Sequence, residues 1–247
     1  MDPLTSAAAS GLQARMDSFD LLANNLANTS ASGYKADREF YSTYLSPEAL
    51  AASDPAVGDS PVVQRQWTDF AQGSITNTSN PTDLALSGKG FFTINGPNGP
   101  LYTRNGSFQV SPLGALVTGE GYPVRLTGGQ PVTLDPGAQI VVGPDGTVSQ
   151  NGAALGQLEI VDFSDPSLLA KFGGTNFQNP DPQKISTQAA TNVHVAQGKL
   201  ESSNSVPAES AVRMVTLLRQ FEMLQHAVKI GAEMNRQAVE EVAKVGS

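Results

Sequence analysis

Apolar residues recur at alternating spacings of three and four near the C-terminal end of the chain, which is the pattern of a helix that buries a narrow face. This pattern runs from Met214 to Val245 and is interrupted by Gly231 and Asn235. It predicts a long helix over about residues 206–244, packed along a partner helix with a 3.5-residue period. The predicted seam includes Met214, Leu217, Phe221, Leu224, Val228, Ala238 and Val242.

The N-terminal stretch has the same period with smaller side chains, and Asp2 followed by Pro3 is typical of a helix start. We expect this helix to pair with the C-terminal helix as a coiled coil, because each seam needs an apolar partner. Two independent amphipathic helices on one globular core are the alternative. The predicted N-terminal seam is Thr5, Ala9, Leu12, Met16, Phe19, Ala23 and Leu26.

Between the two helical patterns, short β-forming runs alternate with turns rich in glycine, proline and asparagine. Examples are the runs GFFTI, LYTR, SFQV and IVV and the turn Asn105-Gly106. The fold class expected is therefore mixed α and β, with N- and C-terminal helices pairing as a coiled coil and an all-β domain inserted between them.

Changes of pattern along the chain predict five parts. They are an N-terminal helix (1–30), a linker or extended segment with a flexible loop at 46–61 (31–75), an all-β outer domain (76–192), a return segment (193–205) and a C-terminal helix (206–247).

Polar residues mark the end of the first helix and the start of the last. Asn24, Asn25 and Asn28, followed by Gly33, indicate either simple helix termination or a polar collar where segments or subunits meet, and we interpret them as an assembly turn. At the other end, Asn204 or Ser205 suits a helix cap, Pro207 suits a first turn, and Glu209 complements the helix dipole.

The charge composition excludes two classes of partner. The chain has a formal net charge of -8 and no lysine or arginine cluster, so it offers no positively charged surface that would attract nucleic acid or an anionic membrane. No run approaches the roughly 20 apolar residues that span a bilayer, so we expect no direct membrane insertion. The N-terminus also lacks the pattern of a cleaved secretory signal. Without cysteine, disulfides and thiolate chemistry are excluded.

No motif argues for catalysis. His194 and His226 are far apart without ligand spacing, and no HExxH, GxSxG or Walker-type pattern is present. We therefore expect no enzyme activity, no metal and no cofactor. A secreted β-rich binding module or enzyme with helical assembly ends, or an export chaperone or adaptor, are the competing functions; the large β region argues against the chaperone.

Several stretches resemble the bacterial flagellar basal-body rod and hook protein family. They are LANNLANTSASGYKAD, LALSGKGFFTI, YTRNGSFQVSPLGALVTGEGYPV, LESSNSVPAE and MVTLLRQFEM, and they follow the order found in the family. The Gly-Tyr-Lys element adds Tyr34 to the turn, and the Leu-Glu-Ser-Ser-Asn element adds Glu201 to the start of the last helix. Within the family, the length and the Arg219–Met223 run are most similar to a proximal rod component, with a distal rod component second.

The resemblance implies a structural subunit that stacks helically through its terminal helices into a torque-transmitting axial tube, with a β-rich outer domain. Its partners would be copies of itself, other flagellar rod and hook axial proteins, and the flagellar type III export apparatus. Its location would be the rod of the basal body in the periplasmic space, reached from the cytoplasm without a cleaved signal peptide.

Overall fold

The computed structural model describes residues 3–44, 60–135 and 137–245. The chain forms two compact units. Unit 1 takes its described residues from 1–27, 37–67 and 206–247, and unit 2 takes its described residues from 28–36 and 68–205. The predicted flexible loop at 46–61 falls, up to residue 59, outside the described residues.

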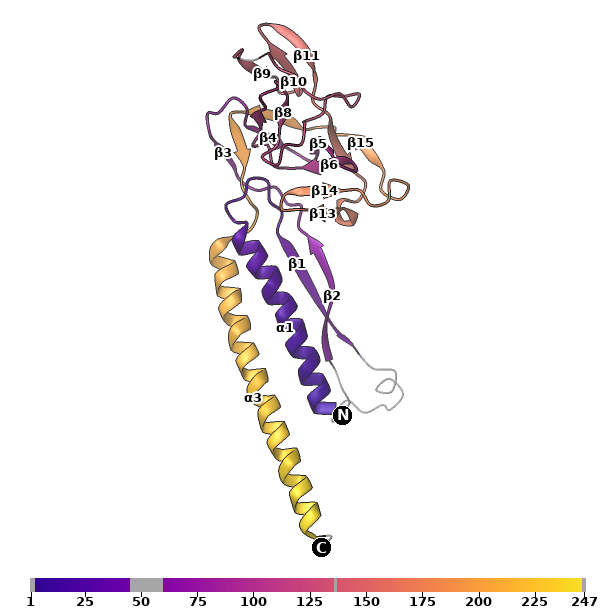
Figure 1. Ribbon diagram of the computed structural model, residues 1–247, viewed down its shortest axis with the longest axis vertical. Coiled ribbons are helices and arrows are strands. Elements are labelled where there is room, and N and C mark those ends of the chain that lie inside the picture. The colour runs from indigo at the N-terminus through magenta and orange to yellow at the C-terminus, as the bar shows by residue number, and fades with distance from the viewer. Residues whose placement is uncertain (1–2, 45–59, 136, 246–247) are drawn as a thin grey trace. The chain divides into compact units, whose positions relative to one another are not determined.

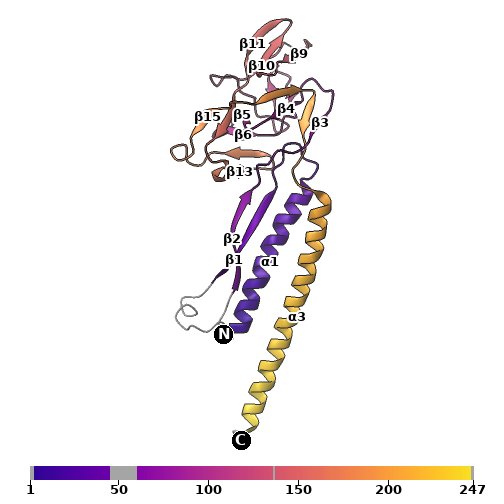
Figure 2. The ribbon, with the colours of Figure 1, turned by 180° about the vertical axis from the view of Figure 1, so that it is seen from behind.

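Unit 1 contains the two α-helices and one pair of strands. These are α1 (Pro3–Ala27), α3 (Pro207–Val245), β1 (Asp37–Tyr44) and β2 (Ser60–Thr68). In both views of the ribbon, α1 lies between α3 on one side and the β1–β2 pair on the other (Figures 1 and 2). α1 thus has two neighbours within the unit.

The start of α3 follows from its first residues. Pro207 is the first helical residue; its fixed φ suits a helix, and it lacks an N–H that would have no partner at that position. Val206 accepts a hydrogen bond from the Ser210 amide at 3.0 Å, and Glu209 places a negative charge in the first turn. Asn204 does not cap this helix: its side chain bonds backbone groups of unit 2 instead.

The expected fold class is wrong. The described residues hold two α-helices against seventeen strands, so the protein is mainly β, and the terminal helices do not pair as the predicted coiled coil. On α3, Leu217 alone is buried among the predicted seam residues whose side chains the structure describes, which excludes Ala238 and Val242. On α1, Met16 of the predicted seam is 51% exposed.

The second neighbour of α1 explains this difference. Because β1 also contacts α1, the buried face of the helix is shared between two partners, whereas a coiled-coil seam faces only one. Periodicity reveals that a helix has an apolar face but does not reveal how many elements cover it. Within residues 11–27, the part of α1 whose side chains are described, the buried stripe is offset from the predicted seam and consists of Gly11, Ala14, Ser18, Leu21, Leu22 and Asn25.

Unit 2 is built of strands joined by tight turns. The strands are β3 (Ile75–Asn77), β4 (Leu84–Ser87), β5 (Phe91–Gly96), β6 (Gly99–Thr103), β7 (Gln109–Val110), β8 (Leu116–Val117), β9 (Ile140–Val142), β10 (Thr147–Gln150), β11 (Ala153–Gln157), β12 (Ile160–Phe163), β13 (Ala170–Phe172), β14 (Asn176–Gln178), β15 (Thr187–Ala189), β16 (His194–Gln197) and β17 (Lys199–Glu201), with a short 3-10 helix at Pro166–Leu168.

The largest sheet is six-stranded, in the order β13-β14-β6-β5-β12-β15, and every pairing in it is antiparallel. Side chains alternate between the faces of a strand, so the adjacent Phe91 and Phe92 enter two different cores. Phe92 packs with Leu84, Ile94 and residues of β8 to β10, while Phe91 packs with Tyr102 and other aromatic residues. The central sheet is therefore covered on both faces.

The C-terminal strands close unit 2. β16 pairs with β4, and β17 pairs with β3, so residues 194–201 return to strands more than 100 positions earlier in the chain. Among the described residues, neither helix is long and apolar enough to cross a membrane.

Candidate functional site

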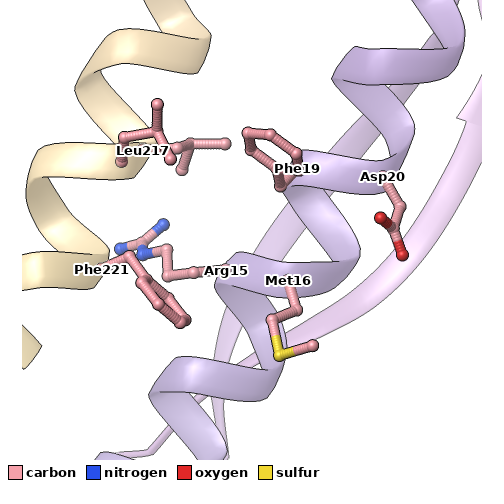
Figure 3. A pocket seen from close by; sticks show the side chains of 7 residues that line it. Arg15, Met16, Phe19, Asp20, Leu217 and Phe221 are labelled. Carbon is pink, nitrogen blue, oxygen red and sulfur yellow. The ribbon is translucent and has the colours of Figure 1, made fainter. Parts of the chain in front are cut away.

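An apolar groove lies between α1 and α3 within unit 1. Its volume is about 230 Å³. Figure 3 shows Phe19 of α1 facing Leu217 of α3, with Phe221 and Met16 one turn further along the helices. Arg15 and Asp20 supply the charged part of the lining, and Leu218 completes it. Such a surface suits contact with an apolar side chain of another polypeptide.

The predicted seam residues lie in and around this groove. Leu217 is buried, whereas Met214, Phe221, Leu224 and Val228 are half-buried. On α1, Leu12, Phe19 and Leu26 are half-buried. A Cβ added to Gly11 would lie 3.7 Å from Cδ1 of Leu224, which shows how closely the two helices approach there. The side chain of Val242 lies outside the described residues.

A second apolar stripe on α3 was missed from the sequence. Val212, Met223, Ile230 and Met234 are separated by 11, 7 and 4 positions, each close to a whole number of 3.6-residue turns. All four are at least 50% exposed. The stripe lies on a different side of α3 from the groove residues, so α1 does not cover it.

The asparagine-rich turn is held by side-chain bonds to the backbone. Asn25 is buried, donates to the carbonyl of Asp37 at 2.7 Å and accepts from its amide at 2.9 Å, so it fixes the first residue of β1 against α1. Asn24 is exposed and Asn28 half-buried. These bonds are made within unit 1.

Gly33 and Tyr34 belong to unit 2 and are both buried. Gly33 has a φ of +67°, and a Cβ at this position would lie 2.3 Å from the backbone carbon of Arg104. Only glycine fits both constraints. Tyr34 packs its ring 4.6 Å from the Nζ of Lys171, which also donates to the Lys35 carbonyl at 2.9 Å.

Beside Tyr34, a cluster of buried charges occupies unit 2. The Glu201 carboxylate is fully buried; its Oε1 lies 2.6 Å from Lys35 Nζ and its Oε2 lies 3.2 Å from Arg104 Nη1. The Gly73 amide also donates to Oε1 at 2.9 Å. Burial lowers the pKa of Lys35 and the pKa of Arg104, and the charge of Glu201 opposes both shifts.

Asn204 supports the same region. Its Oδ1 accepts from the Ala36 amide at 2.7 Å, and its Nδ2 donates to the carbonyls of Asp69 and Ala71. The sequence singled out Glu201 and Asn204 only as parts of a helix start. It missed Lys35 and Arg104 as buried ions, because nothing local in a sequence indicates that residues 166 and 97 positions apart will meet.

The remaining candidates carry no chemistry of this kind. His194 and His226 are both exposed, and Glu209 forms an exposed ion pair with Arg213 at 3.1 Å. No group of three metal-ligating side chains occurs among the described residues. A mainly-β protein with an exposed apolar stripe on α3 and an apolar groove between its two helices belongs to the class of proteins that work through contacts with other polypeptides.

Comparison with known proteins identifies the family. Residues 85–150 match the flagellar hook protein FlgE/F/G D1 domain, and residues 196–241 match the flagellar basal body rod FlgEFG protein C-terminal domain. The chain is 34% identical over 232 residues to the flagellar basal-body rod protein FlgF of Caulobacter vibrioides, with 92% of each chain covered.

Two further relatives have similar names. The chain is 30% identical to the basal-body rod protein FlgF of Salmonella typhimurium, over 81% of this chain and 82% of the relative. It is 29% identical to the rod protein FlgG of Buchnera aphidicola subsp. Schizaphis graminum, over 95% of this chain and 97% of the relative. The chain belongs to the flagellar basal-body rod protein family. It is a structural subunit of the rod in the basal body, so the family, role and location predicted from the sequence are confirmed.

Proposed function

We propose that unit 1 builds the rod by packing its helices against neighbouring copies of this chain. The observation that carries this proposal is the exposed stripe of Val212, Met223, Ile230 and Met234, which α1 leaves uncovered. An apolar stripe of this length on a helix gains free energy when a second helix removes it from water. The groove lined by Phe19 and Phe221 offers a second apolar surface on the same unit.

The two surfaces are different, so contact between them in neighbouring copies is heterologous. Heterologous contacts that do not close into a ring generate a helical filament, and a filament continuous along its axis can transmit torque. A copy of the same chain is the partner we infer, because both surfaces belong to one unit of this chain. We propose a non-enzymatic role for the protein.

The finer assignments rest on the resemblance to relatives. We place the chain in the proximal part of the rod, with other flagellar rod and hook axial proteins as further neighbours. We also propose that it leaves the cytoplasm through the flagellar type III export apparatus. The length of the chain and its Arg219–Met223 run, which are most similar to a proximal rod component, support the first assignment.

Substitution of the exposed stripe tests the proposal. A strain without its own copy of the gene would receive Met223→Glu, Ile230→Glu or the unchanged chain, and motility and isolated basal bodies would be compared. We expect both variants to fold but to yield basal bodies with truncated rods. Ala211→Glu is the matched control, because it adds the same charge to an exposed position of α3 that lies roughly 100° or more around the helix from the stripe. Normal rods in both stripe variants would refute the proposed surface.

A further inference from the structure

The buried charges of unit 2 do not balance. Two cations, Lys35 and Arg104, share the single carboxylate of Glu201. Asp69 and Asp162 favour the charged forms of Lys35 and Arg104 respectively, but Glu201 is the strongest charged partner of both. Lys35 is fully buried and Arg104 almost so. Removing Glu201 would leave two buried cations next to each other, an arrangement that strongly destabilises a protein interior.

The three charges come from distant parts of the chain. Lys35 arrives with the N-terminal segment 28–36, Arg104 follows β6, and Glu201 ends β17. The C-terminal segment bonds the N-terminal one directly: the Gly33 amide donates to the Glu201 carbonyl at 2.7 Å, and the Ala36 amide donates to Asn204 Oδ1. The carbonyl of Ala36 in turn accepts from the Asp69 amide at 2.8 Å.

The order in which these segments can come together is therefore constrained. Arg104 follows β6, and its Cζ lies 5.3 Å from the centre of the Phe91 ring, so this cation takes its place when the central sheet forms. Docking of Lys35 beside it would then bring a second cation into a site that excludes water. Without the carboxylate, both the repulsion between the two cations and the loss of their hydration oppose this step.

We propose that Glu201 makes docking of the N-terminal segment 28–36 onto unit 2 conditional on prior or simultaneous docking of the C-terminal segment 199–204. The two ends of the chain are thereby coupled through one carboxylate. If the chain is exported with its N-terminus first, a premise that rests on the proposed function, residues 28–36 would stay undocked until almost the whole chain had emerged.

Native-state hydrogen exchange on the purified full-length chain tests the coupling without any need for export or assembly. The Asp69 and Ala36 amides report docking of segment 28–36, and the Thr93 and Leu116 amides report the central core, where they donate to the carbonyls of Glu159 and Val132. We expect Glu201→Gln to lower protection at Asp69 and Ala36 by roughly 100-fold or more, because a broken buried pair leaves uncompensated charge.

Rescue separates this mechanism from simple loss of packing. Lys35→Met keeps the length of the side chain and removes one cation, so adding it to Glu201→Gln should restore at least about tenfold of the lost protection. Glu159→Gln is the matched control, since Glu159 is paired with Arg125 in the same unit but is only partly buried. It should leave the protection of Asp69 and Ala36 unchanged.

A loss of protection that is confined to Asp69 and Ala36 and is restored by Lys35→Met supports the coupling. Three results would overturn it: unchanged protection at Asp69 and Ala36 in Glu201→Gln, equal loss at Thr93 and Leu116, or a loss that Lys35→Met does not restore. None of these depends on the rod, so failure of the stripe variants to impair assembly would leave this result intact.

Discussion

Lys35 and Glu201, 166 positions apart, form a buried ion pair with Nζ and Oε1 separated by 2.6 Å. This pair joins the segment that leaves the first helix to the segment that leads into the last. In a rod protein, both segments adjoin the helices that we propose for assembly. The packing of both segments within unit 2 therefore depends on the same few side chains.

The first prediction concerns alkaline pH. Burial lowers the pKa of Lys35 below 10.5, so between the folded pKa and 10.5 the unfolded chain binds more protons than the folded chain. The contribution of Lys35 to stability must then rise with pH across this window and be smallest below it. Urea unfolding measures the free energy of unfolding of the wild type and of Lys35→Met. As pH approaches 10.5, the free energy of unfolding of the wild type should rise relative to that of Lys35→Met. A constant difference would contradict the lowered pKa.

The second prediction concerns Gly33. Gly33→Ala should destabilise unit 2 by more than about 2 kcal/mol, because a positive φ alone costs roughly 1–2 kcal/mol and the added Cβ would collide with the Arg104 backbone. Gly173 has a φ of +77° but open space around it, so Gly173→Ala is the matched control and should cost only the conformational part. Urea denaturation followed by circular dichroism measures both. If both variants lose the same free energy of unfolding, the structure relieves the contact between the new Cβ and the Arg104 backbone without further loss of stability.

The third prediction concerns Asn25. Asn25→Ala removes both bonds to the Asp37 backbone in a buried site, which should destabilise unit 1 by about 1–3 kcal/mol. The loss should appear as a lower melting temperature of the helical signal. Gln13→Ala is the control, since it removes only an exposed bond to Asp17 on the same helix. A similar melting temperature for both variants would argue that Asn25 merely ends the helix.

The fourth prediction concerns the groove. Phe221→Asp and Leu224→Asp place a charge where apolar side chains of α1 and α3 meet, so motility should be lost while the β-sheet signal of unit 2 is retained. Gln225→Asp, at an exposed neighbouring position, should swim normally. Swimming by the groove variants would show that this surface has no role in assembly.

The sequence was sufficient for whatever depends on local pattern. Pro207 and the apolar spacing after it mark the start and extent of α3, and the runs around Phe91 and Leu101 mark strands β5 and β6. Short motifs such as Gly-Tyr-Lys were specific enough to identify the family. The positive φ of Gly33 also follows a local rule, since a glycine after a helix end commonly adopts it.

Only the tertiary structure decided which faces are covered. The apolar repeat of α1 was visible in the sequence, but the sequence did not show that β1 is a second neighbour of this helix, and this led to the wrong fold class. Likewise, Lys35 and Arg104 have no local feature that distinguishes them from solvated surface cations. They become buried ions because strand pairing brings Glu201 back to them, and contacts between distant positions depend on the whole fold.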